Sequence, residues 1–193
     1  MRMDKYGSQI KKKVFGAILI LSFILTGCAQ VRVYSSKPAI QNVSNAHYNA
    51  QFEPQLAEGK HYFNAFRLVI TNKTDKDLAL DWSKTYYLLN GRRNGQFGWE
   101  KMSFEELKGI KDQPFVTIGP ENTLSTVVFP LKLIAWEEYT RGGTRKQDSK
   151  PEESFYPGVI PEGENGISLY IKQGDKVIQE RITFNITLEV LRK

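Results

Sequence analysis

Cysteine and histidine are scarce in this chain, which has one cysteine and two histidines among 193 residues. A single cysteine excludes an intrachain disulfide, so a folded domain must rely on its hydrophobic core. The histidines, His47 and His61, have no third metal ligand at a suitable spacing, and the sequence therefore predicts no metal site. We expect both to be surface or strand-end residues.

Groups for catalysis are equally few. The sequence contains neither a Gly-x-Ser-x-Gly nucleophile motif nor a glycine-rich phosphate loop before a helix. Its glutamate pairs are adjacent residues: Glu105-Glu106, Glu137-Glu138 and Glu152-Glu153. Because neighbours on a strand point to opposite faces, such pairs are poorly placed to act together on one substrate bond. We interpret them as solvated charge and predict that the protein is not an enzyme.

Long apolar stretches are missing except for Val14–Leu25, whose 12 residues are interrupted only by Gly16 and Ser22. This stretch is too short to cross a hydrocarbon layer of about 30 Å as a helix. It follows three consecutive lysines, Lys11–Lys13, and a basic segment before a short apolar core is typical of a signal peptide. We predict a signal peptide over residues 1–27, with a helical core.

The apolar stretch ends in Leu25, Thr26, Gly27 and Cys28. These residues resemble the lipobox of bacterial lipoproteins: a leucine, a small residue or threonine, a glycine or alanine, and a cysteine. The resemblance implies that the Cys28 thiol receives a diacylglycerol through a thioether. It also implies that a lipoprotein signal peptidase cleaves between Gly27 and Cys28, after which the new amine can be acylated. An ordinary signal peptide or a membrane helix is the alternative.

A lipidated Cys28 would determine where the protein is found. Each buried methylene contributes about 0.8 kcal/mol, so one acyl chain gives reversible attachment and two or three give an effectively permanent one. No transmembrane segment, and no cofactor beyond this covalent lipid, is then required. Ala29 and Gln30 lack the aspartate that retains enterobacterial lipoproteins in the inner membrane. The resemblance therefore implies the periplasmic side of the outer membrane if the source has two membranes; a single-membrane source stays open.

The excess of positive charge lies mostly in the leader. The chain has a formal charge of +6, and residues 1–27 hold five basic residues against one acidic residue, or +4, which leaves +2 for the rest. A nucleic-acid-binding patch would have to survive removal of the leader. We therefore predict no nucleic-acid partner.

The segment that begins with the cysteine, residues 28–45, is polar and rich in small residues after Cys28. We expect a flexible tether there, between the lipid and the domain. The alternative is that Val31–Tyr34 forms a short first strand, because apolar and polar residues alternate in it. The domain itself is assigned to residues 46–193.

Alternation with a period of two dominates this domain and predicts antiparallel strands with one buried face. In Tyr62–Thr71, for example, Phe66, Leu68 and Ile70 share a face. The other expected strands are Tyr48–Phe52 (ended by Pro54), Leu78–Trp82, Thr85–Leu89 (ended by Asn90-Gly91), Gln96–Trp99 (pairing back), Phe115–Ile118, Thr123–Leu133, Ile167–Ile171 and Val177–Leu191. Ser103–Gly109 has the capping pattern of a short helix, and Arg141–Asn165 is expected to be a long loop.

Many short strands with almost no helix predict an all-β fold, a β-sandwich. Within it, Phe66–Lys76 followed by Leu78 and Leu80 is similar to the strand-turn-strand unit of immunoglobulin-like domains in bacterial envelope proteins. The resemblance implies an immunoglobulin-like antiparallel β-sandwich with one short helix. The Cys…Trp…Cys pattern of antibody domains is absent, and a jelly roll or a small barrel stays open as an alternative.

Aromatic residues supply the candidate binding positions. Those within expected strands are assigned to the core: Trp82 and one of Tyr86 or Tyr87. Trp99, Trp136 and Tyr156 lie beside turns, glycine or proline. We predict that these three contact a partner, because aromatic side chains are enriched at interfaces.

Two functions of different class follow from these observations. The leading hypothesis is a lipid-anchored envelope lipoprotein that acts as a non-enzymatic interaction or structural module, with an envelope protein or glycan as partner. The alternative is a periplasmic carbohydrate-binding accessory or hydrolase, which would require acidic or aromatic residues to converge in one cleft.

Overall fold

The structure is a computed structural model that describes residues 30–100, 102, 106, 107, 115–138 and 153–192. The expected signal peptide and the lipobox with Cys28 lie outside these residues. The chain is divided into two units, of which the second is Val33–Glu189. The core and the faces discussed below belong to the second unit.

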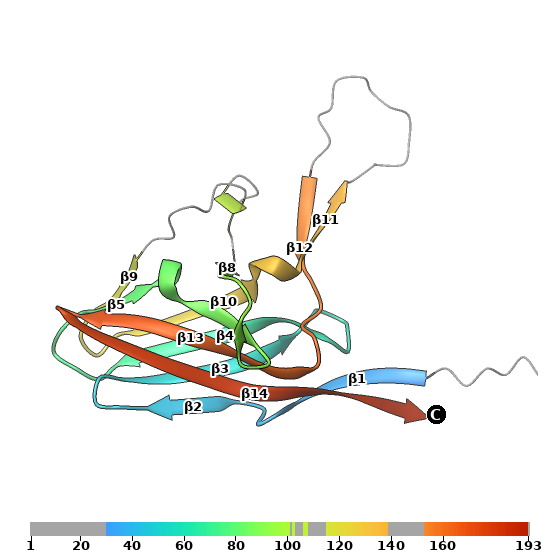
Figure 1. Cartoon of the computed structure of the whole chain (residues 1–193), viewed down its shortest axis with the longest axis horizontal. Helices are drawn as coiled ribbons and strands as arrows, with labels where there is room; N and C mark the ends of the chain where they lie inside the picture. Colours follow the sequence, from blue (N-terminus) through green and yellow to red (C-terminus); the bar gives the residue numbers. More distant parts are fainter. Residues whose placement is uncertain (1–29, 101, 103–105, 108–114, 139–152, 193) are drawn as a thin grey trace, which may run out of the picture. The chain divides into compact units, whose positions relative to one another are not determined.

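The strands form two antiparallel sheets and a separate hairpin (Figure 1). The order of the seven-stranded sheet is β1-β14-β13-β5-β9, with β6 also pairing with β13 and β7 with β6. Its strands are β1 (Gln30–Lys37), β5 (Leu78–Asp81), β6 (Tyr86–Leu89), β7 (Arg92–Arg93), β9 (Phe115–Ile118), β13 (Gly163–Gln173) and β14 (Lys176–Arg192).

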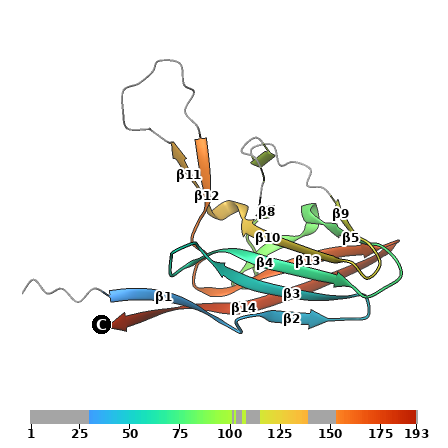
Figure 2. The ribbon, with the colours of Figure 1, turned by 180° about the vertical axis from the view of Figure 1, so that it is seen from behind.

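The second sheet has five strands in the order β2-β3-β4-β10-β8 (Figure 2). They are β2 (Gln41–Ser44), β3 (Tyr48–Leu56), β4 (Phe63–Asn72), β8 (Phe97–Trp99) and β10 (Thr123–Pro130). The hairpin consists of β11 (Ile134–Glu138) and β12 (Glu153–Pro157), and two short 3-10 helices are η1 (Trp82–Lys84) and η2 (Leu131–Leu133).

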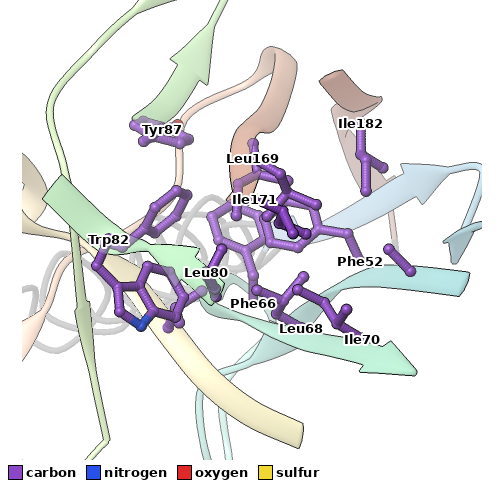
Figure 3. Packing of buried hydrophobic residues seen from close by; sticks show 14 of the residues in the cluster. Phe52, Phe66, Leu68, Ile70, Leu80, Trp82, Tyr87, Leu169, Ile171 and Ile182 are labelled. Carbon is purple, nitrogen blue, oxygen red and sulfur yellow. The ribbon is translucent and has the colours of Figure 1, made fainter. Parts of the chain in front are cut away.

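Both sheets contribute to one hydrophobic core (Figure 3). On β4, Phe66, Leu68 and Ile70 are fully buried, as the alternation predicts. The seven-stranded sheet contributes Tyr87 and Phe184, whose ring centroids lie 6.0 and 5.7 Å from that of Phe66. Burial of a side chain of this size contributes roughly 1.5–3 kcal/mol. The sheets therefore meet through their apolar faces, and the prediction of an all-β sandwich is confirmed.

The C-terminal hairpin also agrees with the prediction. β13 and β14 pair from Gly163 with Ile186 to Gln173 with Lys176, and Gly174 makes the turn at a φ of +58°. Along β14 the side chains that face the core are Ile182, Phe184 and Ile186. The period-two pattern therefore located this hairpin and its buried face as far as Ile186, whereas Val190, of the same parity, is 47% exposed.

The segment expected as a tether, residues 28–45, instead contains strands β1 and β2. The alternative interpretation, a strand over Val31–Tyr34, is the one that the structure has. The reason is a partner distant in sequence, since Ser35 Oγ and Thr187 Oγ1 lie 2.9 Å apart across β1 and β14. Tyr34 also packs against the core. Composition alone does not reveal a partner of this kind.

The turn at Asn90-Gly91 is confirmed, but the expectation that Gln96–Trp99 pairs back is wrong. Both residues have positive φ, +49° and +73°, and they join Leu89 to Arg92 as a two-residue hairpin. β8, however, pairs with Val128–Pro130 of β10 in the other sheet. The chain changes sheets between β7 and β8, which local alternation cannot show.

One strand limit and one expected loop also differ from expectation. β3 continues through Pro54, because β2 begins at Gln41 opposite Phe52 and leaves the rest of β3 as a sheet edge, where proline is tolerated. β12 lies inside the expected loop Arg141–Asn165 and pairs with β11. The helix expected over Ser103–Gly109 falls largely outside the described residues.

Candidate binding surface

The three aromatic residues predicted to contact a partner occupy different places. Trp99 ends β8, is half-buried, and stacks on Trp82 with ring centroids 5.8 Å apart and an interplanar angle of 28°. Trp136 and Tyr156 occupy neighbouring rungs of the β11–β12 hairpin, and Tyr156 is 44% exposed. The side chain of Trp136 lies outside the described part of the chain. Trp99 is therefore a core-margin residue, and two of the three candidates share a hairpin.

The core assignments among the aromatic residues are confirmed. Trp82 is 2% exposed and Tyr87 is fully buried. Tyr86, the neighbour of Tyr87 on β6, is half-buried instead, because adjacent strand residues point to opposite faces.

The histidines lie outside the strands. His47 Nδ1 is 2.8 Å from Gln173 Oε1, and its Nε2 is 2.9 Å from Lys176 Nζ. Because a lysine ammonium can only donate, Nε2 accepts this bond, and Nδ1 carries the proton donated to Gln173. His61 is exposed. Among the residues described, no three histidine, cysteine, aspartate or glutamate side chains are grouped to hold a metal ion.

The outer face of the seven-stranded sheet, opposite the core, carries aromatic and basic side chains. On β13, Leu169 and Ile171 are buried, so the alternating residues Tyr170 and Lys172 point outward. Phe115 on β9 also points outward and is 56% exposed, because its neighbour Val116 lies opposite the buried Leu80.

The same face continues onto the strands on either side of β13. Tyr86 on β6 and Arg181 on β14 both lie opposite the outward-pointing Ser168, and residues directly opposite each other share a face. We call this surface the basic–aromatic face. Its residues are Lys84, Tyr86, Arg93, Phe115, Tyr170, Lys172 and Arg181.

Three cations of this face lie over three of its rings. Arg93 Cζ is 4.5 Å from the ring centroid of Tyr86, and Lys84 Nζ is 4.9 Å from that of Tyr170. The third pair, Lys172 Nζ over Phe115, is looser at 5.6 Å. Each such contact contributes about 0.5–1 kcal/mol at an exposed site and restricts the side chain that carries the charge. The cations are therefore held in place before any partner arrives.

One of these cations is balanced internally. Lys84 Nζ lies 3.7 Å from Oδ2 of Asp81, which is 1% exposed. Oδ1 of Asp81 accepts hydrogen bonds from the backbone N–H and hydroxyl of Ser83 at 3.1 and 2.5 Å, which caps η1. In contrast, Arg93, Lys172 and Arg181 form no ion pair within the described residues. These three charges are open to a partner.

Buried polar groups stabilise the sheet beneath this face. The Tyr87 hydroxyl donates to Asn165 Oδ1, and Asn165 Nδ2 donates to the carbonyls of Pro161 and Gly163 at 2.9 and 3.0 Å. The Thr85 hydroxyl donates to the carbonyl of Asp81 at 2.8 Å. These bonds fix β6 and η1, and with them Tyr86 and Lys84, against β13.

Burial shifts the acidity of the two most buried tyrosines. Desolvation raises the pKa of Tyr87 far above its ordinary value. Desolvation also raises the pKa of Tyr48 to about 12, with Glu180 adding to the rise and Asn45 opposing it. Both phenols are therefore neutral at any physiological pH and act as core residues.

The chain matches no protein-family model, no curated protein and no solved structure. No helix in the described part of the chain is long and apolar enough to cross a membrane.

The basic–aromatic face was not found by sequence reasoning. Its residues come from six elements between Lys84 and Arg181, and no local motif connects them. The usable signal was strand parity: the buried set Ile167, Leu169 and Ile171 leaves Tyr170 and Lys172 outward. Which rings and cations then meet depends on strand order, which parity does not give.

Proposed function

We propose that this protein is a lipid-anchored cell-envelope lipoprotein whose β-sandwich is a non-enzymatic interaction module. The lipobox at Leu25–Cys28 supports the anchor. The basic–aromatic face is the observation that carries the interaction role, because interfaces are enriched in aromatic residues and arginine. A non-enzymatic role is supported by Asp81, the buried carboxylate next to this face, because its Oδ1 caps η1 through Ser83 and its Oδ2 lies 3.7 Å from the Lys84 ammonium.

The proposal includes an immunoglobulin-like topology and a location at the outer membrane. An immunoglobulin-like topology is supported by the strand-turn-strand unit of β4 and β5 and by the division of the strands between two sheets. The residues after Cys28 support the periplasmic side of the outer membrane in a source with two membranes.

The intact mass of the protein recovered from its native membranes tests the anchor. We expect a chain beginning at Cys28 that carries a diacylglycerol, with or without a further acyl group. The Cys28→Ala variant should lose membrane retention and keep the circular dichroism spectrum of a β-protein. An unmodified thiol, or a chain that still bears its leader, would contradict the anchor.

Cross-linking in intact membranes tests the interaction role. We expect the wild-type protein to be recovered repeatedly with the same partner protein. Replicate experiments that recover the protein alone would contradict an interaction module.

A further inference from the structure

We propose that the basic–aromatic face binds an acidic segment of a partner protein. This inference rests on the proposed interaction role and names the chemistry of the partner. Arg93, Lys172 and Arg181 present positive charge without an ion pair inside the described part of the chain. A partner that brings carboxylates supplies the missing counter-charges.

The cation–ring contacts favour carboxylates over uncharged sugars. A sugar would have to stack on the ring faces of Tyr86 and Tyr170, which Arg93 and Lys84 already cover. Carboxylates instead bind the remaining N–H donors of the cations and leave the cation–ring contacts in place. Because these contacts already restrict the long side chains, binding costs less conformational entropy than it would with free lysine or arginine.

The shape and the apolar content of the face favour a protein over a small molecule. The face extends over several adjacent strands of a sheet, whereas small ligands bind in concave pockets. Phe115 and Val177 are 56% and 42% exposed, and Val177 lies directly opposite Lys172. A partner segment that combines acidic with aliphatic residues can therefore pair with the cations and bury these two side chains together.

The test is a calorimetric titration of the full chain with a synthetic peptide of alternating glutamate and valine. A peptide of alternating glutamine and valine is the neutral control. We expect the acidic peptide to bind and the neutral one not to bind. Lys172→Gln and Arg181→Gln should each weaken binding about tenfold, the usual effect of losing a strong interface residue.

Arg67→Gln is the matched control variant. Arg67 is also exposed on a central strand, but it lies on the outer face of the other sheet, so the change in net charge is the same. We expect binding by this variant to equal that of the wild type. Equal weakening by Arg67→Gln and Arg181→Gln would overturn the proposal, because it would show a non-specific charge effect.

Two further arms separate other anionic partners. Polygalacturonate presents carboxylates on a sugar chain, and phosphatidylglycerol vesicles present an anionic lipid surface. Tighter binding of either one than of the acidic peptide would overturn the proposal in favour of a glycan or a membrane. The unfolding midpoint of each variant should match that of the wild type, which shows that a loss of binding is not a loss of fold.

Membrane cross-linking distinguishes failure of this inference from failure of the proposed function. If the triple variant Arg93→Gln, Lys172→Gln, Arg181→Gln recovers the same partner as the wild type, the interaction role stands and the basic–aromatic face is not its site. If neither protein recovers a partner, the interaction role itself fails. We expect the wild-type protein to bind the acidic peptide and to be recovered with its partner, and the triple variant to be recovered without it.

Discussion

The two outer faces of the sandwich both consist of strand residues that alternate with core residues, but their side chains differ in chemistry. On β3 and β4 the outward residues are Asn49, Gln51, Glu53, Gln55, Arg67, Val69 and Thr71, and the two charged ones, Glu53 and Arg67, lie directly opposite each other. On the basic–aromatic face, the residues directly opposite Arg93, Lys172 and Arg181 on β6, β14 and β13 are Leu88, Val177 and Ser168, none of them acidic. The inner faces are restricted by packing, whereas the outer faces are not. The fold therefore does not require the unpaired positive charges on the basic–aromatic face.

The largest expected effect comes from the core that both faces share. Phe66→Ala should lower the free energy of unfolding by ~3–5 kcal/mol, because it leaves a cavity among the rings of Phe52, Tyr87 and Phe184. Urea unfolding followed by tryptophan fluorescence measures the loss. Val69→Ala, on the outward side of the same strand, is the control and should cost far less. A similar cost for both variants would contradict the assignment of the core.

A smaller effect should be confined to the sheet under the basic–aromatic face. Tyr87→Phe removes the donor to Asn165 Oδ1 and leaves a buried acceptor unpaired, at a cost of ~1–3 kcal/mol. Amide hydrogen exchange should accelerate in β6 and β13 more than in β3 and β4. Tyr86→Phe, the outward neighbour, should change neither the stability nor the exchange rates. Equal acceleration in both sheets would contradict a local role of this bond.

Alkaline pH should lower the stability of the fold, because each sheet contains a buried tyrosine that must stay neutral. The folded pKa of Tyr48 is about 12, against an ordinary value of 10.0, so the unfolded chain loses this proton first as the pH rises. The contribution of the neutral Tyr48 phenol to the free energy of unfolding is fully present below pH 10. It is lost as the pH rises toward 12, so the folded state becomes less stable in that window. Unfolding midpoints measured at a series of pH values should fall there, and less steeply in Tyr48→Phe. An unchanged slope in that variant would argue against burial of this hydroxyl.

Replacing an exposed arginine on either outer face should have the smallest effect on stability, although the two replacements should differ most in their effect on peptide binding. Arg181→Gln and Arg67→Gln are both exposed strand substitutions, and each should change the free energy of unfolding by no more than about 0.5 kcal/mol. Chemical denaturation of the two variants side by side is the measurement. A larger loss for Arg181→Gln would mean that the basic–aromatic face contributes to the fold, which would weaken the contrast between the two faces.

The parts of the fold that follow from local alternation were predictable. The buried faces of β4, β13 and β14 came directly from period-two patterns, and the turn at Asn90-Gly91 from the ability of these residues to adopt positive φ. Pairings between distant segments were not predictable, and these include β1 with β14 and β8 with β10. An edge strand such as β1 gains its structure from a partner that its own composition does not identify.

The candidate surface was less predictable than the fold for the same reason. Trp99 was selected because it lies near a turn, yet its ring stacks on Trp82 at the margin of the core. The alternation along their strands was enough to place Tyr170 and Phe115 on the outer face. It did not indicate which residues of other strands lie beside them. Whether a cation lies over each ring depends on how β6, β9 and β13 are ordered in the sheet.

The pairing of β1 with β14 has a consequence for the order in which the fold is completed. Ser35 and Thr187 are 152 positions apart, so this edge can close only after β14 has reached β1 across the rest of the domain. Until then, the earliest segment of the domain exposes unpaired amides and carbonyls that another chain could capture. A chain in which β14 is not yet paired with β1 would therefore have an open sheet edge, which favours aggregation.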